Sequence, residues 1–343
     1  MRRSPLDAWL AGRMGLERLA PEAVQAWRMA ELRRTLAWAR QASPFHAARL
    51  AGVDLDALRG PSDLAVLPRM EAADLAQPGL LTVSQDEVER VVSLPTSGSS
   101  GPPKRLSFSR ADLARTIDFF AVGMGTLAGP GDAVLVLLPG RREWGVADLL
   151  VRALPGIGAR AVLPPEPWAP AELPEFMAAH GVTCLVAAPT QLRALLALPS
   201  QAFGIVRAVL SSAEPLPGDL RAELQAAWGC EVFDHWGMTE TGYGGGVECA
   251  AHSGYHLREA DVLVEIAAPG SGALLPLGAV GEILVTTLGE RAMPLVRYRT
   301  GDAACWLSGP CPCGSPLGRL GRVPGRIGPG GTIVQIRKGE RRA

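Results

Sequence analysis

Hydrophobic and polar residues follow different spacings in different parts of the chain. In the middle part, short and continuously apolar runs alternate with amphipathic stretches of about ten residues. The runs predicted to be strands lie at 132–138, 159–163, 183–187, 205–210 and 231–234. The stretches predicted to be helices lie at 143–154, 171–179, 191–198 and 218–228. Because continuously apolar strands need cover on both faces, this order predicts a doubly wound parallel α/β sheet.

The amino-terminal part, residues 1–90, alternates helical stretches with proline breaks. Its longest amphipathic pattern covers 21–40 and ends before Ser43 and Pro44. This part is therefore predicted to be a helical portion of the protein that precedes the parallel core.

The parallel core is expected to occupy residues 91–245, because the helical spacing disappears from about residue 246 onward. Beyond this point the strand-like segments, separated by Gly and Pro turns, are 261–267, 282–288 and 295–299. They predict a smaller antiparallel sheet or barrel over 246–327. The Gly- and Pro-rich remainder, 328–343, is expected to be a flexible tail.

Composition and charge narrow the class of protein. The chain has 343 residues, and its 34 Lys and Arg balance its 34 Asp and Glu, so its formal net charge is zero. This balance argues against binding to nucleic acid or to an anionic membrane through bulk positive charge. No apolar run approaches the roughly 20 residues that cross a bilayer, and charged residues interrupt the amino terminus. We therefore expect a cytoplasmic protein, and its six cysteines are too sparse for a disulfide scaffold.

A loop rich in small residues carries the clearest chemical signal. After a strand-like stretch at 91–94 come Thr96, Ser97, Gly98, Ser99, Ser100 and Gly101, followed by two prolines and Lys104. Small residues let backbone amides approach an anion, hydroxyls add donors, and lysine supplies a positive charge for phosphate oxygens. It is not a Walker loop, because Pro103 and Arg105 flank the lysine. We interpret it as a phosphate-binding loop, with a flexible linker as the alternative.

Five motifs occur in an order that resembles adenylate-forming acyl ligases. They are the loop ending in Lys104, Ser-Ala-Glu-Pro-Leu at 212–216, Trp-Gly-Met-Thr-Glu at 236–240, Tyr-Arg-Thr-Gly-Asp at 298–302 and Gly-Arg at 321–322. The Ser-Pro-Phe-His and Leu-Pro-Arg-Met stretches at 43–46 and 67–70 are similar to the phenylacetate:CoA ligase branch. The resemblance implies the large amino-terminal domain of these enzymes, which activates a small carboxylic acid with ATP to give an acyl-adenylate and pyrophosphate.

The same resemblance implies roles for the residues that bind phosphate. Residues 96–101 and Lys104 would hold the β- and γ-phosphates of ATP. Glu240 would hold Mg²⁺, a hard cation that prefers carboxylate and phosphate oxygens, and Thr239 would donate to the α-phosphate. CoA is the thiol that would accept the acyl group, and an acyl-carrier protein is an alternative acceptor. Taken alone, Glu240 has a second interpretation as an acid at a helix start.

Further residues match positions that bind the nucleoside. Adenine would be sandwiched by Ala213, Glu214, Pro215 and Trp236, with Asp234 near its amino group. Asp302 matches the acid that accepts hydrogen bonds from both ribose hydroxyls, and Arg322 matches the arginine that closes over the ribose. Trp236 could instead be core and Asp302 a turn residue, but the order of the motifs favours the nucleotide site.

A second constellation has the residue types of a metal site. It consists of Cys249, His256, Cys311 and Cys313. Three thiolates and an imidazole suit tetrahedral zinc, which would be structural because four protein ligands leave no open position. His252 or Cys305 could replace one ligand, and free cysteines are the alternative.

The chain also departs from the pattern of full-length ligases. Its Gly-Arg hinge at 321–326 lacks the acidic pair that usually follows the arginine, and the sequence ends soon after. We therefore expect the small carboxyl-terminal lid domain, with its second catalytic lysine, to be absent, and Lys338 is not assigned that role. A lid-supplying partner protein is one expectation, and a homodimer, frequent in this branch, is another.

Three interpretations stay open at this point. The protein makes an acyl-adenylate, slowly or with a partner; or it binds ATP or an acyl-adenylate without turnover; or it is a zinc-stiffened interaction module. The intact loop and motifs favour the first. The sequence does not identify the acid, although Phe119, Phe120, Trp144 and Gly145 lie in segments that either wall an acyl pocket or belong to the ordinary core.

Overall fold

A nine-stranded sheet forms the centre of the protein in a computed structural model that describes residues 3–94 and 103–335. Its strand order is β13-β14-β9-β8-β7-β6-β5-β3-β4. The mutually parallel strands are β3 (Ala133–Val136), β4 (Arg160–Val162), β5 (Cys184–Ala187), β6 (Ala208–Ser211) and β7 (Glu231–Trp236). The helices that connect them are α5 (Val146–Ala153), α6 (Leu173–Ala179), α7 (Pro189–Leu196) and α8 (Gly218–Trp228).

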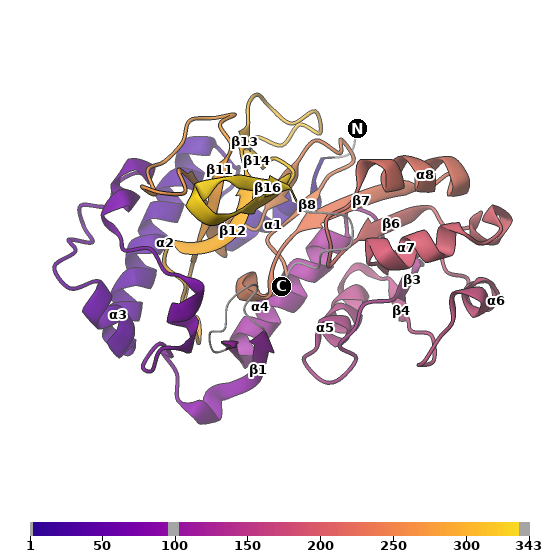
Figure 1. Ribbon diagram of the computed structural model, residues 1–343, viewed down its shortest axis with the longest axis horizontal. Helices are drawn as coiled ribbons and strands as arrows, with labels where there is room; N and C mark the ends of the chain where they lie inside the picture. The colour runs from indigo at the N-terminus through magenta and orange to yellow at the C-terminus, as the bar shows by residue number, and fades with distance from the viewer. Residues whose placement is uncertain (1–2, 95–102, 336–343) are drawn as a thin grey trace.

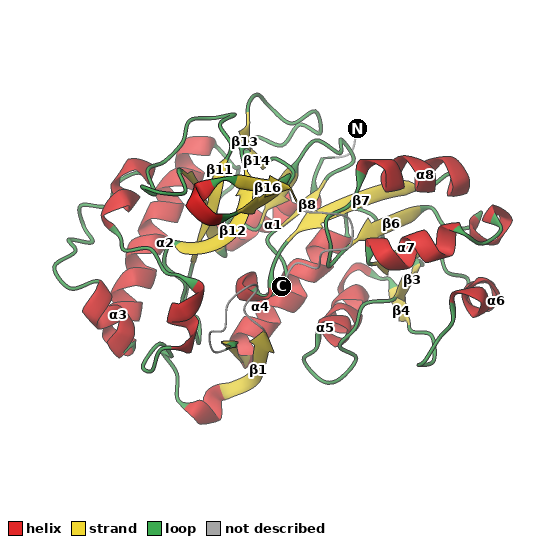
Figure 2. Ribbon diagram, viewed as in Figure 1, coloured by secondary structure: helices red, strands yellow, loops and turns green. Residues whose placement is uncertain are grey.

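Both faces of the parallel strands are covered, as their apolar sequences predict. Val134 and Val136 of β3 face one core, shared with α5 and two helices of the amino-terminal half, α1 (Pro5–Met14) and α4 (Arg110–Met124). Leu135 of the same strand faces the other core, which α6, α7 and α8 complete. Figures 1 and 2 show α7 and α8 beside β6 and β7. The prediction of a doubly wound α/β sheet is confirmed.

Strand order reverses between β3 and β5, because the chain adds β4 on one side of β3 and then β5, β6 and β7 on the other. In sheets of this kind, ligands bind in the crevice outside the carboxyl ends of the strands, at the reversal. The fold therefore places a candidate ligand site at the ends of β3, β5, β6 and β7.

The same sheet continues in antiparallel fashion beyond β7. The added strands are β8 (Gly246–Glu248), β9 (Tyr255–Leu257), β13 (Trp306–Leu307) and β14 (Arg319–Leu320). Strand β8 pairs with β7, with His235 opposite Val247. The sheet thus runs without a break across residue 246, where the sequence changes from helical to strand-like spacing.

A second, five-stranded antiparallel sheet matches the expected smaller β subdomain. It contains β10 (Val262–Ala267), β11 (Gly281–Thr287), β12 (Tyr298–Ala304), β15 (Gly325–Ile327) and β16 (Ile333–Gln335). The strand expected at 295–299 begins later, at Tyr298, because Arg297 has a φ of 45°, outside the extended region. Arg297 instead turns its guanidinium to Glu265, with Nη2 2.9 Å from Oε1.

The amino-terminal half is mainly helical and ends in a hairpin. Its further helices are α2 (Pro21–Ala42) and α3 (Pro44–Arg49), and the hairpin consists of β1 (Val88–Leu94) and β2 (Lys104–Ser109). The short 3₁₀ helices of the described chain are η1 (Pro61–Val66), η2 (Ala72–Ala76), η3 (Gln85–Glu87), η4 (Leu154–Ile157), η5 (Pro170–Glu172), η6 (Ser200–Phe203), η7 (Thr239–Thr241) and η8 (Pro329–Gly331). Among residues 3–94 and 103–335, every helix is too short or too polar to cross a membrane.

Candidate functional site

Three distant segments meet at the carboxylate of Glu240, which lies in η7 just after β7. Lys104, the first residue of β2, donates from Nζ to Glu240 Oε1 at 3.1 Å. Tyr298, the first residue of β12, donates from its hydroxyl to the same oxygen at 3.0 Å. All three side chains are buried. Lys104 and Glu240, to which the resemblance assigns separate roles at phosphate and Mg²⁺, are therefore adjacent. Tyr298, for which the sequence indicated no role, joins them.

The second oxygen of Glu240, Oε2, is buried and has no hydrogen-bond partner among the described residues. Removing a charged oxygen from water without a partner is costly, so this atom favours a cation or donor that a ligand brings. Carboxylate oxygens are the ligands that Mg²⁺ prefers, so the donor set fits this ion. Burial and the neighbouring Glu240 raise the pKa of Tyr298, which keeps its hydroxyl protonated as a donor.

The predicted phosphate loop, residues 96–101, lies outside the described residues, and its role stays a prediction. Its flanks are described: Leu94 and Lys104 pair as the last residues of the β1–β2 hairpin before the loop. The described strand end at Lys104 thus lies at the contact with Glu240. Thr239 precedes Glu240 in η7 and is partly exposed.

Trp236 and Asp302 join the two sheets. Trp236 Nε1 donates to Asp302 Oδ2 at 3.1 Å, and the indole has 0% exposed surface. It packs with Leu257, Ile266 and Ile283 in the core between the sheets. The geometry supports the core role that was the alternative for Trp236, because its buried ring presents no free face to adenine.

The other predicted nucleoside residues cluster around the ends of β6 and β7. Ala213, exposed just beyond β6, has a φ of 68°, an uncommon conformation for a residue other than glycine. Glu214 accepts from Thr190 Oγ1 at 3.1 Å, and Pro215 follows, partly exposed. Asp234 is buried in β7 and accepts from Tyr255 Oη at 2.8 Å. These residues lie at the strand ends where the topology predicts a ligand.

The structure places Arg326, and not Arg322, beside Asp302. Arg326 lies opposite Asp302 in the β12–β15 pair, with Nε 3.6 Å from Oδ1, and it donates to the Thr300 carbonyl at 3.0 Å. Arg322 instead donates to Glu248 Oε1 at 3.4 Å. Within residues 318–326 the Gly-Arg dipeptide occurs three times, at 318–319, 321–322 and 325–326, so the sequence alone could not select the pair that reaches Asp302.

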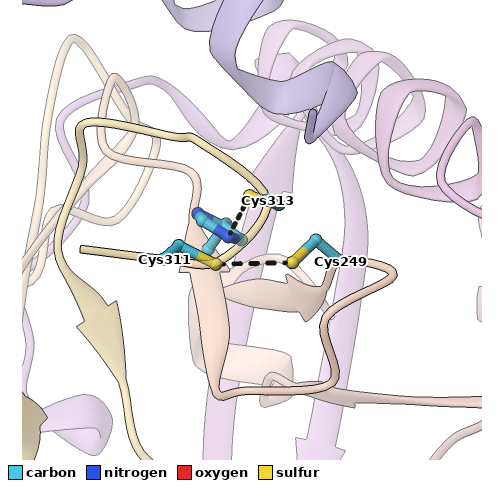
Figure 3. A group of neighbouring side chains, drawn as sticks. Cys249, Cys311 and Cys313 are labelled. Atoms are coloured by element: carbon cyan, nitrogen blue, oxygen red, sulfur yellow. Dashed lines mark hydrogen bonds between the residues drawn. The ribbon is translucent and has the colours of Figure 1, made fainter. Parts of the chain in front are cut away.

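The four predicted metal ligands, Cys249, His256, Cys311 and Cys313, converge (Figure 3). All four are buried, and their ligand atoms lie within 4.8 Å of one another. The Sγ atoms of Cys249 and Cys311 are 3.6 Å apart, and Cys313 Sγ is 3.5 Å from His256 Nε2. A tetrahedron with zinc-like bond lengths has sulfur–sulfur edges of about 3.8 Å and sulfur–nitrogen edges of about 3.5 Å. The sulfur–sulfur and sulfur–nitrogen distances therefore fit one tetrahedral ion.

The protonation chemistry of these residues also fits a metal. Burial lowers the pKa of His256 to about 4, so its imidazole is neutral, the form that binds metals. Burial raises the pKa of Cys249 to about 12, so its thiolate form needs a cation close by. The alternative ligands are placed elsewhere: His252 Nδ1 lies 3.3 Å from Glu248 Oε2, and Cys305 is outside the cluster.

An apolar recess opens at the carboxyl ends of β3, β5 and β6. Its lining comprises Phe119, Phe120, Gly123, Met124, Leu138, Val146, Leu150, Val186, Leu210, Ser212, His235, Tyr243, Gly244, Gly246 and Val247. Phe119 and Phe120 thus line the recess, which agrees with their interpretation as walls of an acyl pocket. Trp144 and Gly145 are not part of this lining. The Arg152 guanidinium instead lies over the Trp144 ring, with Cζ 4.4 Å from the ring centre.

The fold, the strand-end recess and the buried lysine–glutamate pair define an adenylate-forming protein of the mixed α/β class. Comparison with known families agrees: the chain belongs to the AMP-binding enzyme family, whose model matches residues 56–289. It is homologous to acid–thiol ligases that use CoA.

The relatives include two phenylacetate-coenzyme A ligases. The protein from Thermus thermophilus is 30% identical, with 91% of this chain and 72% of that protein covered. The protein from Escherichia coli K12 is 26% identical, with 91% and 73% covered. Among solved structures, an open conformation of 2-hydroxyisobutyryl-CoA ligase in complex with 2-HIB-AMP and CoA superposes with a TM-score of 0.78 at 22% identity. The superposition covers 90% of this chain and 71% of the ligase chain, and it shows that the two share a fold.

The metal cluster leads to the first testable prediction. Protein purified without a histidine tag is expected to contain about one zinc per chain, because a buried Cys₃His set binds zinc tetrahedrally. Cys313→Ser should lose the metal and lower the melting temperature by several degrees, whereas Cys305→Ser should retain it. Elemental analysis and thermal unfolding measure both effects. Metal-free wild-type protein with full thermal stability would contradict the assignment.

Proposed function

We propose that this protein uses ATP and Mg²⁺ to activate an aromatic carboxylic acid as its acyl-adenylate, and then transfers the acyl group to the thiol of CoA. The observation that carries the proposal is the buried contact of Lys104 and Tyr298 with Glu240, whose second oxygen has no partner in the described chain. The aromatic acid is supported by the relatives, which include phenylacetate- and benzoate-CoA ligases.

The first step forms the mixed anhydride. A carboxylate oxygen of the acid attacks the α-phosphorus of ATP, the bond to the bridging oxygen breaks, and pyrophosphate leaves. Lys104 would neutralise the β- and γ-phosphates together with residues 96–101, and Thr239 would donate to the α-phosphate. Glu240 would hold Mg²⁺, which when bound offsets the charge of the phosphates. In the second step the CoA thiol, losing its proton, attacks the acyl carbonyl, and AMP leaves.

The nucleoside would bind between the ends of β6 and β7 and the second sheet. Trp236 donates to Oδ2 of Asp302 and so fixes the position of this carboxylate. Asp302 would then accept hydrogen bonds from the ribose hydroxyls. Arg326 is the arginine we assign to the ribose, since it borders Asp302. Ala213, Glu214 and Pro215, with Asp234 at the neighbouring strand, would border adenine.

The metal cluster has a separate role in the proposal. Cys249, His256, Cys311 and Cys313 would hold a structural zinc, because four protein ligands leave no position for a substrate. The ion would tie the ends of β8 and β9 to the segment between β13 and β14.

Exchange of pyrophosphate into ATP, dependent on phenylacetate or benzoate, tests the activation step. Lys104→Ala is expected to reduce the exchange rate by roughly 10²- to 10³-fold, because a positive charge at the phosphates is lost. The matched control is Arg105→Ala, which removes a positive charge from the next, exposed residue of the same strand and should change the rate less than about twofold. Equal losses in the two variants, or exchange unaffected by Lys104→Ala, would refute the assignment. Tight ATP binding without exchange would favour a binding protein instead.

The choice between the two arginines is tested by nucleotide affinity. Arg326→Ala is expected to raise the dissociation constant of ATP by roughly tenfold, because it removes a charged group beside the proposed ribose acceptor Asp302. Arg322→Ala, which alters the Gly-Arg pair at 321–322, should change the dissociation constant less than about twofold. Titration calorimetry measures both values. A larger effect at Arg322 than at Arg326 would reverse the assignment.

A further inference from the structure

The apolar recess contains one hydrogen-bonded polar pair, Ser212 with His235. His235 Nε2 and Ser212 Oγ are 2.8 Å apart. The pair is set by the register of the sheet: Ser211 at the end of β6 lies opposite Asp234 of β7, which brings the next residue of each strand together. Ser212 is buried and His235 partly buried, and both line the recess.

The rest of the recess lining is mostly apolar, in contrast to Ser212 and His235. Most of the walls are aliphatic or aromatic side chains, among them Phe119, Phe120 and Leu210. The third polar lining residue, Tyr243, has its phenol engaged by the Arg90 side chain and its ring stacked on Phe108 at 5.9 Å. The Ser212 hydroxyl thus lies in the recess where it can offer a hydrogen bond to a bound acid.

The chemistry of the pair selects the group that it can recognise. A serine hydroxyl donates one hydrogen bond and accepts two, so the contact with the imidazole uses only part of its capacity. Depending on the imidazole tautomer, Ser212 presents either its proton or a lone pair to a ligand, and a hydroxyl group satisfies both arrangements. A charged ammonium would lose its hydration in this apolar recess without a carboxylate lining it, which is unfavourable.

We propose that Ser212, positioned by His235, recognises a hydroxyl substituent, so that the preferred substrate is a hydroxylated aromatic acid and not the unsubstituted one. The inference rests on the proposed acyl activation and adds the class of acid. A site that hydrogen-bonds a substrate hydroxyl discriminates strongly against the analogue without it, because its own buried polar group then loses a partner.

The test compares phenylacetate with its 2-, 3- and 4-hydroxy derivatives and with mandelate in the pyrophosphate exchange assay. For the wild-type protein, kcat/KM for at least one hydroxylated acid should exceed that for phenylacetate by tenfold or more, on the order of one strong hydrogen bond. In Ser212→Ala this ratio should fall to near one, and Ser212→Thr, which restores the hydroxyl, should recover much of it.

Ser211→Ala is the matched control, since it removes a buried hydroxyl from the preceding residue, which does not line the recess, and the ratio should not change. Thermal unfolding of each variant separates loss of folding from loss of preference. A wild-type preference for phenylacetate, or a hydroxyl preference that survives Ser212→Ala, would overturn the inference while leaving acyl activation intact. Exchange with none of the acids would instead overturn the proposed function, and the inference with it.

Discussion

The carboxylate of Glu240 is the point at which the three parts of this protein meet. It follows the central strand β7, and it receives hydrogen bonds from the first residue of β2 and the first residue of β12. A buried carboxylate is tolerated only when donors or cations surround it. The hairpin, the parallel sheet and the second sheet must therefore be in register for this group to be stable. One of its oxygens accepts hydrogen bonds from the protein, and the other is buried without a partner among the described residues. In the proposed function a nucleotide-bound cation would complete it.

A second buried acid, Glu248, connects this region with the metal cluster. It has 0% exposed surface, accepts from Arg221 Nη2 at 2.8 Å and from the Asp234 amide at 3.0 Å, and precedes Cys249. Its neighbours hold its pKa below the usual value despite burial. Likewise Tyr255, whose hydroxyl bonds Asp234, precedes the ligand His256. The metal ligands thus adjoin the two residues that hold Asp234 in β7, so the proposed zinc would help to shape the nucleoside side of the proposed site.

Much of the fold could be predicted from local patterns, because continuously apolar runs such as 183–187 that alternate with amphipathic helices are typical of a covered parallel sheet. The order of the motifs singled out Lys104 and Glu240 as candidate site residues, but their direct contact is seen only in the structure. The position of Arg326 could not be predicted, because three Gly-Arg pairs lie close together in 318–326. Only the register of β12 against β15 brings one of them, Arg326, to Asp302. The Ser212–His235 pair was missed for the same reason, because the register of β6 against β7 brings the two residues together. Tyr298 was missed because its contact with Glu240 joins segments that are far apart in sequence.

The central claim is that the unpartnered oxygen of Glu240 binds the Mg²⁺ of a bound nucleotide. The most direct measurement is calorimetric titration of ATP, with and without Mg²⁺, into the wild-type protein and Glu240→Gln, which keeps the shape and an acceptor for Lys104 but removes the charge. The account predicts that Mg²⁺ tightens ATP binding to the wild-type protein by tenfold or more, and that this gain is largely lost in the variant. An equal gain from Mg²⁺ in both proteins would contradict it.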